Sequence, residues 1–241
     1  MTTGLTARQT QILKTIVDEY IATAGAVGSA SLDKKYNLGV SPATIRAEMA
    51  ALTSMKYLRQ AHTSAGRVPT PAAMKFYINQ LMEEKQLGVT EEVKAKEEVW
   101  DVRGDFDKLV SVATQALANK THSLVVAATD DGESWKAGMK NIFDNPEFSD
   151  ALICQSIFSM IEEEPRIHKL LFETLTGLSA VEVLFGSELL WPALDDLGMV
   201  ATRFSARGRQ GAICVIGPIR TTPSMIPSVR YFRSLIEELM Q

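Results

Sequence analysis

Long apolar runs are absent from this sequence, and no stretch reaches the roughly 18 apolar residues that a membrane-spanning helix needs. The first eight residues hold no apolar segment, so no secretory signal is expected. Only two cysteines occur, and each lies in an apolar stretch. This favours two buried thiols in a reducing compartment over a disulfide between Cys154 and Cys214. These absences predict a cytoplasmic protein with no membrane contact.

The sequence also lacks the arrangements that carry enzyme chemistry. It shows no Ser-His-Asp set, no nucleophile elbow and no phosphate-cradling glycine loop. His122 and His168 are far apart in the chain and lack neighbours of the metal-ligand type. We therefore expect no catalytic residues, no metal and no cofactor.

Acidic residues are missing from one long stretch, since none lies between Glu48 and Glu83. Residues 1–82 carry nine Lys or Arg and four Asp or Glu, a balance of +5. The whole chain has a net charge of −4, so the remainder carries −9. A basic segment on an acidic body is typical of a protein that approaches phosphates with one domain only.

Apolar spacing predicts three helices at the N-terminal end. The first covers about residues 6–23, with Thr6 as N-cap, and a short second helix covers about 30–36. Ser41 followed by Pro42 is a specific start signal for the third. The inner face of this third helix is predicted to carry three residues at i, i+4 and i+7: Ile45, Met49 and Leu52.

A β-hairpin is predicted directly after the third helix. Residues 57–60 and 67–70 read as short strands, and the small polar loop 61–66 joins them. Three helices followed by such a hairpin indicate a winged helix-turn-helix. We assign this DNA-binding domain to residues 1–82.

The rest of the chain predicts a second domain of the α+β class. Residues 83–103 are dominated by Glu and Lys, which favours a solvated helical linker outside any core. Residues 104–241 then alternate helices with a small, mainly antiparallel sheet. The predicted strands of that sheet are 123–129, 181–185, 199–204 and 212–216.

Several stretches resemble the HrcA family, the heat-inducible transcription repressors of bacteria. VGSASL, SPATIRAEMAAL and above all YLRQAHTSAGRVPT are similar to the family's N-terminal domain. NIFDNPEFSD and GAICVIGPIR resemble segments of its C-terminal part. The sequence departs from the family at Ala47, where members usually have Asn, and at Ala61, where they usually have Pro.

The resemblance implies that residues 104–241 form a reduced GAF-like domain for regulation or dimerisation. Family members typically carry an inserted dimerisation domain in their middle region. Here the predicted strand ending at Thr129 runs almost directly into Trp135, so that insert is expected to be missing.

The resemblance further implies a sequence-specific repressor of heat-shock (chaperone) genes. The family binds CIRCE, an inverted-repeat operator in double-stranded DNA. An inverted repeat requires a two-fold symmetric protein, so a homodimer is implied. The GroEL chaperonin is the family's usual modulator.

We expect the outer face of the third helix and the hairpin to contact DNA. Arg46 can donate twice to a guanine edge, whereas Ser41 lies where a helix start can hold a phosphate. Hairpin residues would follow phosphates or enter the minor groove, and Gly66 would allow a tight turn and close approach. The candidate DNA-binding residues are Ser41, Ala43, Thr44, Arg46, Ala47, Arg59, His62, Thr63, Ser64, Gly66 and Arg67.

The sequence leaves other interpretations open. The basic residues could form an ordinary solvated face. The protein could be a one-component regulator that senses a small molecule through its C-terminal domain. It could also be a chaperone client or scaffold with degenerate DNA contacts.

Overall fold

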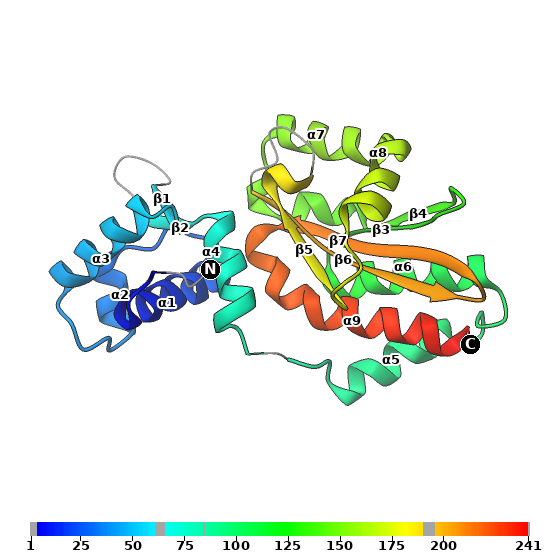
Figure 1. Ribbon diagram of the computed structural model, residues 1–241, viewed down its shortest axis with the longest axis horizontal. Helices are drawn as coiled ribbons and strands as arrows, with labels where there is room; N and C mark the ends of the chain where they lie inside the picture. Colours follow the sequence, from blue (N-terminus) through cyan, green and yellow to red (C-terminus); the bar gives the residue numbers. More distant parts are fainter. Residues whose placement is uncertain (1–3, 61–65, 84, 190–195, 241) are drawn as a thin grey trace. The chain divides into compact units, whose positions relative to one another are not determined.

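A computed structural model describes residues 4–60, 66–83, 85–189 and 196–240 of the 241-residue chain. The described residues form two compact units, Met1–Glu83 and Glu84–Gln241 (Figure 1). Each unit has its own core and is described by itself.

The first unit contains three helices, a two-stranded hairpin and a closing helix. These are α1 (Ala7–Thr23), α2 (Ser29–Lys35), α3 (Pro42–Ser54), β1 (Leu58–Gln60), β2 (Arg67–Pro69) and α4 (Pro71–Phe76), which continues as a π-helical turn, η1 (Tyr77–Leu81).

Side-chain caps fix where α1 and α3 begin, as the sequence predicts. The Thr6 hydroxyl accepts from the Gln9 N–H, and the Gln9 side chain accepts from the Thr6 N–H, a complete capping box. At α3, the Ser41 hydroxyl accepts from the N–H of Thr44 and proline takes the first helical position. The inward residues of α3 are fully or almost fully buried: Ile45, Met49 and Leu52.

The hairpin is attached to the segment between α1 and α2. β1 and β2 pair antiparallel. Beyond this pair, Val27 and Arg67 exchange two backbone hydrogen bonds, each with an N···O distance of 2.8 Å. The hairpin is therefore anchored to the helices by main-chain bonds as well as by its side chains.

The second unit is built on a five-stranded sheet, which confirms the α+β class. Every pairing between described strands is antiparallel, and the strand order is β4-β3-β7-β6-β5. The edge strand β4 is not among the strands that the sequence predicted. The strands are β3 (Leu124–Thr129), β4 (Ser134–Ala137), β5 (Glu182–Phe185), β6 (Leu197–Ala206) and β7 (Arg209–Pro218).

Helices cover both faces of this sheet (Figure 1). α6 (Phe106–Thr121) and α9 (Thr222–Leu239) lie on one face, and α7 (Ala151–Glu162) and α8 (Glu164–Lys169) lie on the other. Alternate residues of β3 join the apolar cluster beneath α7 and α8, while those between them are buried on the opposite side. Burial on both faces explains why β3 reads as an unbroken apolar run.

The helix predicted within residues 83–103 is present, but its assignment as a solvated linker outside any core is wrong for most of its length. Val89–Trp100 forms α5, which packs against α6 within the second unit. Its Ala95 and Val99 are buried, and the Tyr231 hydroxyl of α9 donates to the Glu92 carbonyl at 2.8 Å. The Glu/Lys-rich composition hid this, because only two small apolar side chains of the helix enter the core.

Both cysteines are free thiols in the described structure, and they differ in burial. Cys214 lies on β7 within the apolar cluster, and burial raises its pKa to about 12. Cys154 on α7 is only partly buried. Because the thiolate is the reactive form, we expect a thiol reagent at pH 8 to modify Cys154 and spare Cys214 in the folded protein. Mass spectrometry of the labelled native chain checks this, and rapid labelling of both thiols would contradict it.

Candidate nucleic-acid interface

The outer face of α3 is exposed and consists of small side chains around one arginine. Its exposed residues recur at helical spacing: Ala43, Arg46, Ala47, Ala50 and Ser54. Small side chains allow the helix backbone to come close to another surface. The face is therefore shaped for entry into a groove, with Arg46 as the long side chain that extends from it.

Arg46 makes no hydrogen bond or ion pair with any residue that the structure describes. Its guanidinium is exposed and carries five N–H donors in a planar fork. A guanine presents two acceptors, O6 and N7, in the major groove. The geometry of this face thus suits a bidentate contact with a base edge.

Most of the first N–H groups of α3 are already committed. Pro42 has no N–H, the N–H of Thr44 donates to the Ser41 hydroxyl, and that of Ile45 donates to the Ser41 carbonyl. The hydroxyls of Ser41 and Thr44 also lie 3.0 Å apart. A phosphate at this end would find the N–H of Ala43 and the hydroxyls of Ser41 and Thr44, fewer groups than an open helix start offers.

Two acidic side chains of the first unit, Glu48 and Glu19, are held by neighbours within it. The Glu48 carboxylate accepts from the Gln9 amide at 3.1 Å and lies 3.8 Å from the Arg8 guanidinium. Glu19 accepts hydrogen bonds from the Lys35 ammonium at 2.6 Å and from the Tyr36 hydroxyl. These bonds hold the pKa of Glu19 below its usual range.

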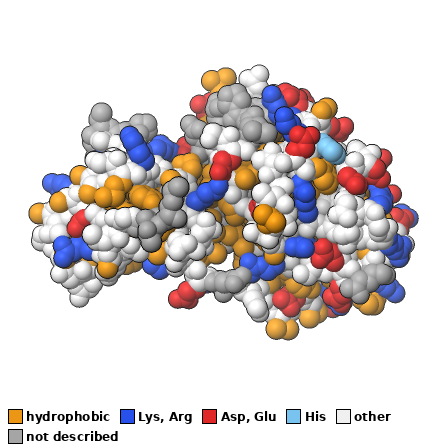
Figure 2. Space-filling view, in the orientation of Figure 1, with side chains coloured by type: hydrophobic (Ala, Val, Ile, Leu, Met, Phe, Trp, Pro, Cys, Tyr) orange, Lys and Arg blue, Asp and Glu red, His pale blue; other side chains and the backbone are white. Residues whose placement is uncertain are grey.

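The surface of the first unit reflects this balance. On the face seen in Figure 2, blue basic side chains predominate over red acidic ones in the first unit, whereas both signs mingle over the second. The first unit thus has the charge that a phosphate backbone attracts.

The described part of the hairpin places Arg59 on the surface of β1. The candidates His62, Thr63 and Ser64 lie outside the described residues. Arg67 is half-buried, and its Nε donates to the Thr53 hydroxyl of α3 at 3.3 Å. Arg67 therefore links the hairpin to the end of α3, a structural contact that the sequence did not predict.

Gly66 is required by the fold itself. A Cβ built there would lie 2.1 Å from the Val27 carbonyl oxygen and 2.7 Å from the Gly28 nitrogen. Contacts under 3.0 Å with backbone atoms do not occur without displacement. The space that a side chain would need is occupied by the segment that the hairpin pairs with, so the fold needs glycine here independently of any contact with DNA.

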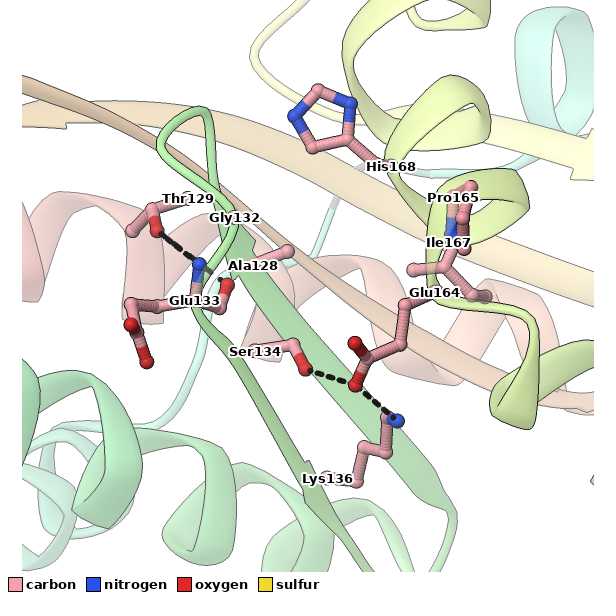
Figure 3. Close-up of a pocket in the computed structure, with 10 residues that line it drawn as sticks. All are labelled: Ala128, Thr129, Gly132, Glu133, Ser134, Lys136, Glu164, Pro165, Ile167 and His168. Atoms are coloured by element: carbon pink, nitrogen blue, oxygen red, sulfur yellow. Dashed lines mark hydrogen bonds and ion pairs between the residues drawn. The ribbon is translucent and has the colours of Figure 1, made fainter.

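A separate cavity of about 250 Å³ lies in the second unit, between the β3–β4 hairpin and α8 (Figure 3). One Glu164 carboxylate oxygen lies 3.3 Å from both the Ser134 hydroxyl and the Lys136 ammonium of β4. Lys136 is mostly buried, whereas Glu164 is 63% exposed. An exposed carboxylate of the chain thus occupies a place where two donors converge.

The helical segment that follows α8 is held by Arg203 of β6. Its guanidinium donates to the carbonyls of Leu171, Phe172 and Leu175, at the end of the π-helical turn η4 (Leu170–Thr174) that follows α8. The last carbonyls of a helix have no partner within it, so a side-chain donor stabilises this end.

Across the described residues, no cluster of three or more His, Cys, Asp or Glu side chains has metal-ligand geometry. None of the described helices is both long enough and apolar enough to cross a membrane.

The chain falls among proteins whose curated members are named as repressors of transcription. The family model described as "HrcA protein C terminal domain" matches residues 70–222. The chain belongs to the HrcA family, as the resemblance at residues 41–70 predicted.

Three relatives show how the match is distributed, and each is named "Heat-inducible transcription repressor HrcA". That of Chloroflexus aggregans is 39% identical over 55% of this chain and only 35% of its own length. That of Desulforudis audaxviator is 28% identical over 90% of this chain and 92% of its own, and that of Carboxydothermus hydrogenoformans is 25% identical over 97% of both.

The two long alignments also support a shortened chain. They run over 317 and 335 positions, although the chain has 241 residues, so about a hundred positions of each hold no residue of this chain. A crystal structure titled as a hypothetical protein at 2.2 Å resolution shares the fold. It has a TM-score of 0.76 at 17% identity and covers 98% of both chains.

Proposed function

We propose that this protein is a sequence-specific transcription repressor that reads double-stranded DNA with α3 and the hairpin of a winged helix-turn-helix. The observation that carries the proposal is the exposed face of small side chains around Arg46, on a unit in which Glu48 and Glu19 are held by internal partners. Arg46 and Ala47 would face bases, with Ala43 and Thr44 near them. Ser41 and Arg59 would hold phosphates.

The operator is proposed to be an inverted repeat of the CIRCE type, upstream of chaperone genes. The support is membership of the HrcA family and the names of its curated relatives as heat-inducible repressors. An inverted repeat presents two equivalent half-sites, so two copies of the chain would bind as a symmetric homodimer.

A gel shift at a stated salt concentration tests this function. Wild-type protein is expected to bind a CIRCE-type duplex about 10³-fold more tightly than a scrambled duplex, with two chains per duplex. Equal affinity for the two duplexes would contradict sequence-specific repression.

Regulation by the GroEL chaperonin is proposed on the same grounds. The chaperonin would keep a marginally stable repressor folded, and heat would release the operator by unfolding the repressor or by diverting the chaperonin. Operator affinity is then expected to survive a heat step better with chaperonin than without it. An affinity that does not respond to chaperonin counts against this regulation.

A second candidate function is a regulator that senses a small molecule, favoured by the cavity between β4 and α8. Lys136 and Ser134 would receive an anionic group in place of Glu164. A thermal-shift screen with small carboxylates and phosphates separates the candidates. Ligand-dependent stabilisation favours the sensor, whereas operator binding without any such stabilisation favours the heat-shock repressor.

Arg67→Ala separates phosphate binding from support of the hairpin. If the guanidinium holds a phosphate, all duplexes should bind more weakly to a similar degree, and the salt slope should fall by about 0.9 per chain. If it acts only through Thr53, stability should fall by about 1 kcal/mol with the slope unchanged. Salt titrations and thermal unfolding of the same variant distinguish these results.

A further inference from the structure

Lys56, in the turn between α3 and β1, has a backbone conformation that lysine rarely adopts. Its φ is +67°. Its N–H donates to the Thr53 carbonyl, and the N–H of Tyr57 donates to the Leu52 carbonyl, each at 3.0 Å. These two bonds define a Schellman ending, in which the left-handed residue is usually glycine. A residue with a Cβ is strained there.

The surrounding structure prevents this strain from relaxing. The Lys56 carbonyl accepts from the Thr70 hydroxyl at 2.7 Å, and Thr70 also caps α4. The turn is thus fixed by the end of α3 on one side and by the start of α4 on the other. Strained residues that are held in this way commonly serve function at a cost to stability.

No contact of the Lys56 side chain within the described structure offsets this strain. The side chain is exposed, and it forms no ion pair with any residue in the described part of the chain. No acidic residue occurs between Glu48 and Glu83, and Glu48 is held by Gln9 and Arg8. The one internal benefit is the attraction of a cation to the C-terminal end of a helix.

The position of Lys56 along α3 suits a contact with the DNA backbone. A helix of 13 residues is about 20 Å long, whereas the major groove is about 12 Å wide. A helix that enters the groove therefore has an end close to a sugar–phosphate strand. Lys56 follows the last residue of α3 by two positions, and its flexible side chain extends further.

We propose that Lys56 is a phosphate-binding residue. Its charge increases the affinity for DNA, and its strained backbone lowers the stability of the first unit relative to glycine at the same position. This inference rests on the proposed function. It predicts that one substitution, Lys56→Gly, stabilises the first unit and weakens its binding to DNA. Relief of the backbone strain raises the unfolding temperature, and loss of the charge lowers the affinity for DNA.

The test combines thermal unfolding with salt titrations of DNA binding, on the full chain. Lys56→Gly should raise the unfolding temperature of the first unit by about 5 °C. It should also lower the salt slope by about 0.9 per chain, on CIRCE-type and scrambled duplexes alike. Lys56→Arg keeps both strain and charge and should change neither. Lys14→Ala removes one charge from the Lys14–Asp18 pair of α1 and should leave the slope unchanged.

An unchanged salt slope for Lys56→Gly would overturn the inference and leave Lys56 as a helix-end cation only. Wild-type binding that does not distinguish the two duplexes would overturn the proposed function alone, because the slope on either duplex still tests Lys56. A chain that binds neither duplex would overturn both.

Discussion

Gly66→Ala is expected to unfold the hairpin and to destabilise the first unit by about 3 kcal/mol. The added methyl group would lie 2.1 Å from the Val27 carbonyl oxygen, where backbone must move to make room. That movement would break the two hydrogen bonds between Val27 and Arg67. Thermal unfolding should show a fall of more than about 10 °C for this unit, with loss of operator binding.

Gly4→Ala is the matched control, because a Cβ at Gly4 meets no atom within 4 Å. It should leave unfolding and DNA binding within experimental error of the wild type. A Gly66→Ala protein of normal stability would contradict the close approach of the hairpin to Val27. If such a protein also lost operator binding, Gly66 would instead lie against DNA.

Arg46→Ala is expected to weaken binding to the inverted repeat by about 1–3 kcal/mol, or about 5- to 150-fold per half-site. It should relax the preference over a scrambled duplex. The reason is the loss of a bidentate contact from an exposed side chain that has no structural partner in the described protein. Unfolding should not change, so the measurement is affinity for both duplexes at one salt concentration.

Arg46→Lys is the informative companion to this variant. Lysine keeps the charge but lacks the planar fork that matches a guanine edge. It should bind the scrambled duplex as the wild type does and still lose much of the preference for the operator. If the Arg46→Lys protein keeps the full preference of the wild type for the operator, Arg46 acts through charge alone and does not read a base.

The first unit followed local sequence signals closely. The starts of α1 and α3 depend on Thr6 and on Ser41 with Pro42, which act within a few residues of the chain. The exposed face of α3 was also predictable, since helical periodicity alone places Ala43, Ala47 and Ala50 opposite the buried Ile45 and Met49, with Arg46 at the edge of that exposed face.

Contacts between distant segments were not predictable from the sequence. The residues next to Gly66 in the sequence do not indicate that Val27 occupies the adjacent space, or that Arg67 donates a hydrogen bond to Thr53. The same holds for α5, whose charged composition predicted a solvated linker although Ala95 and Val99 pack in the second unit. The composition of a helix indicates its exposed face well. A narrow buried face of small residues changes the composition little, so the sequence does not predict it.

The Schellman ending at Lys56 illustrates the same limit at short range. A glycine there would have predicted a left-handed turn, but lysine carries no such signal. The conformation emerges only because Tyr57 and Thr70 make bonds that the helix end requires.

Site-specific photocrosslinking from α3 tests the central claim most directly. In a Cys154→Ala background, a photoreactive probe is attached to Ala50→Cys, on the exposed face of α3, or to Lys14→Cys on α1. We expect the probe on α3 to crosslink to bases within each half of the inverted repeat, and the probe on α1 to crosslink weakly or not at all. Crosslinks from α1 with none from α3 would contradict the account.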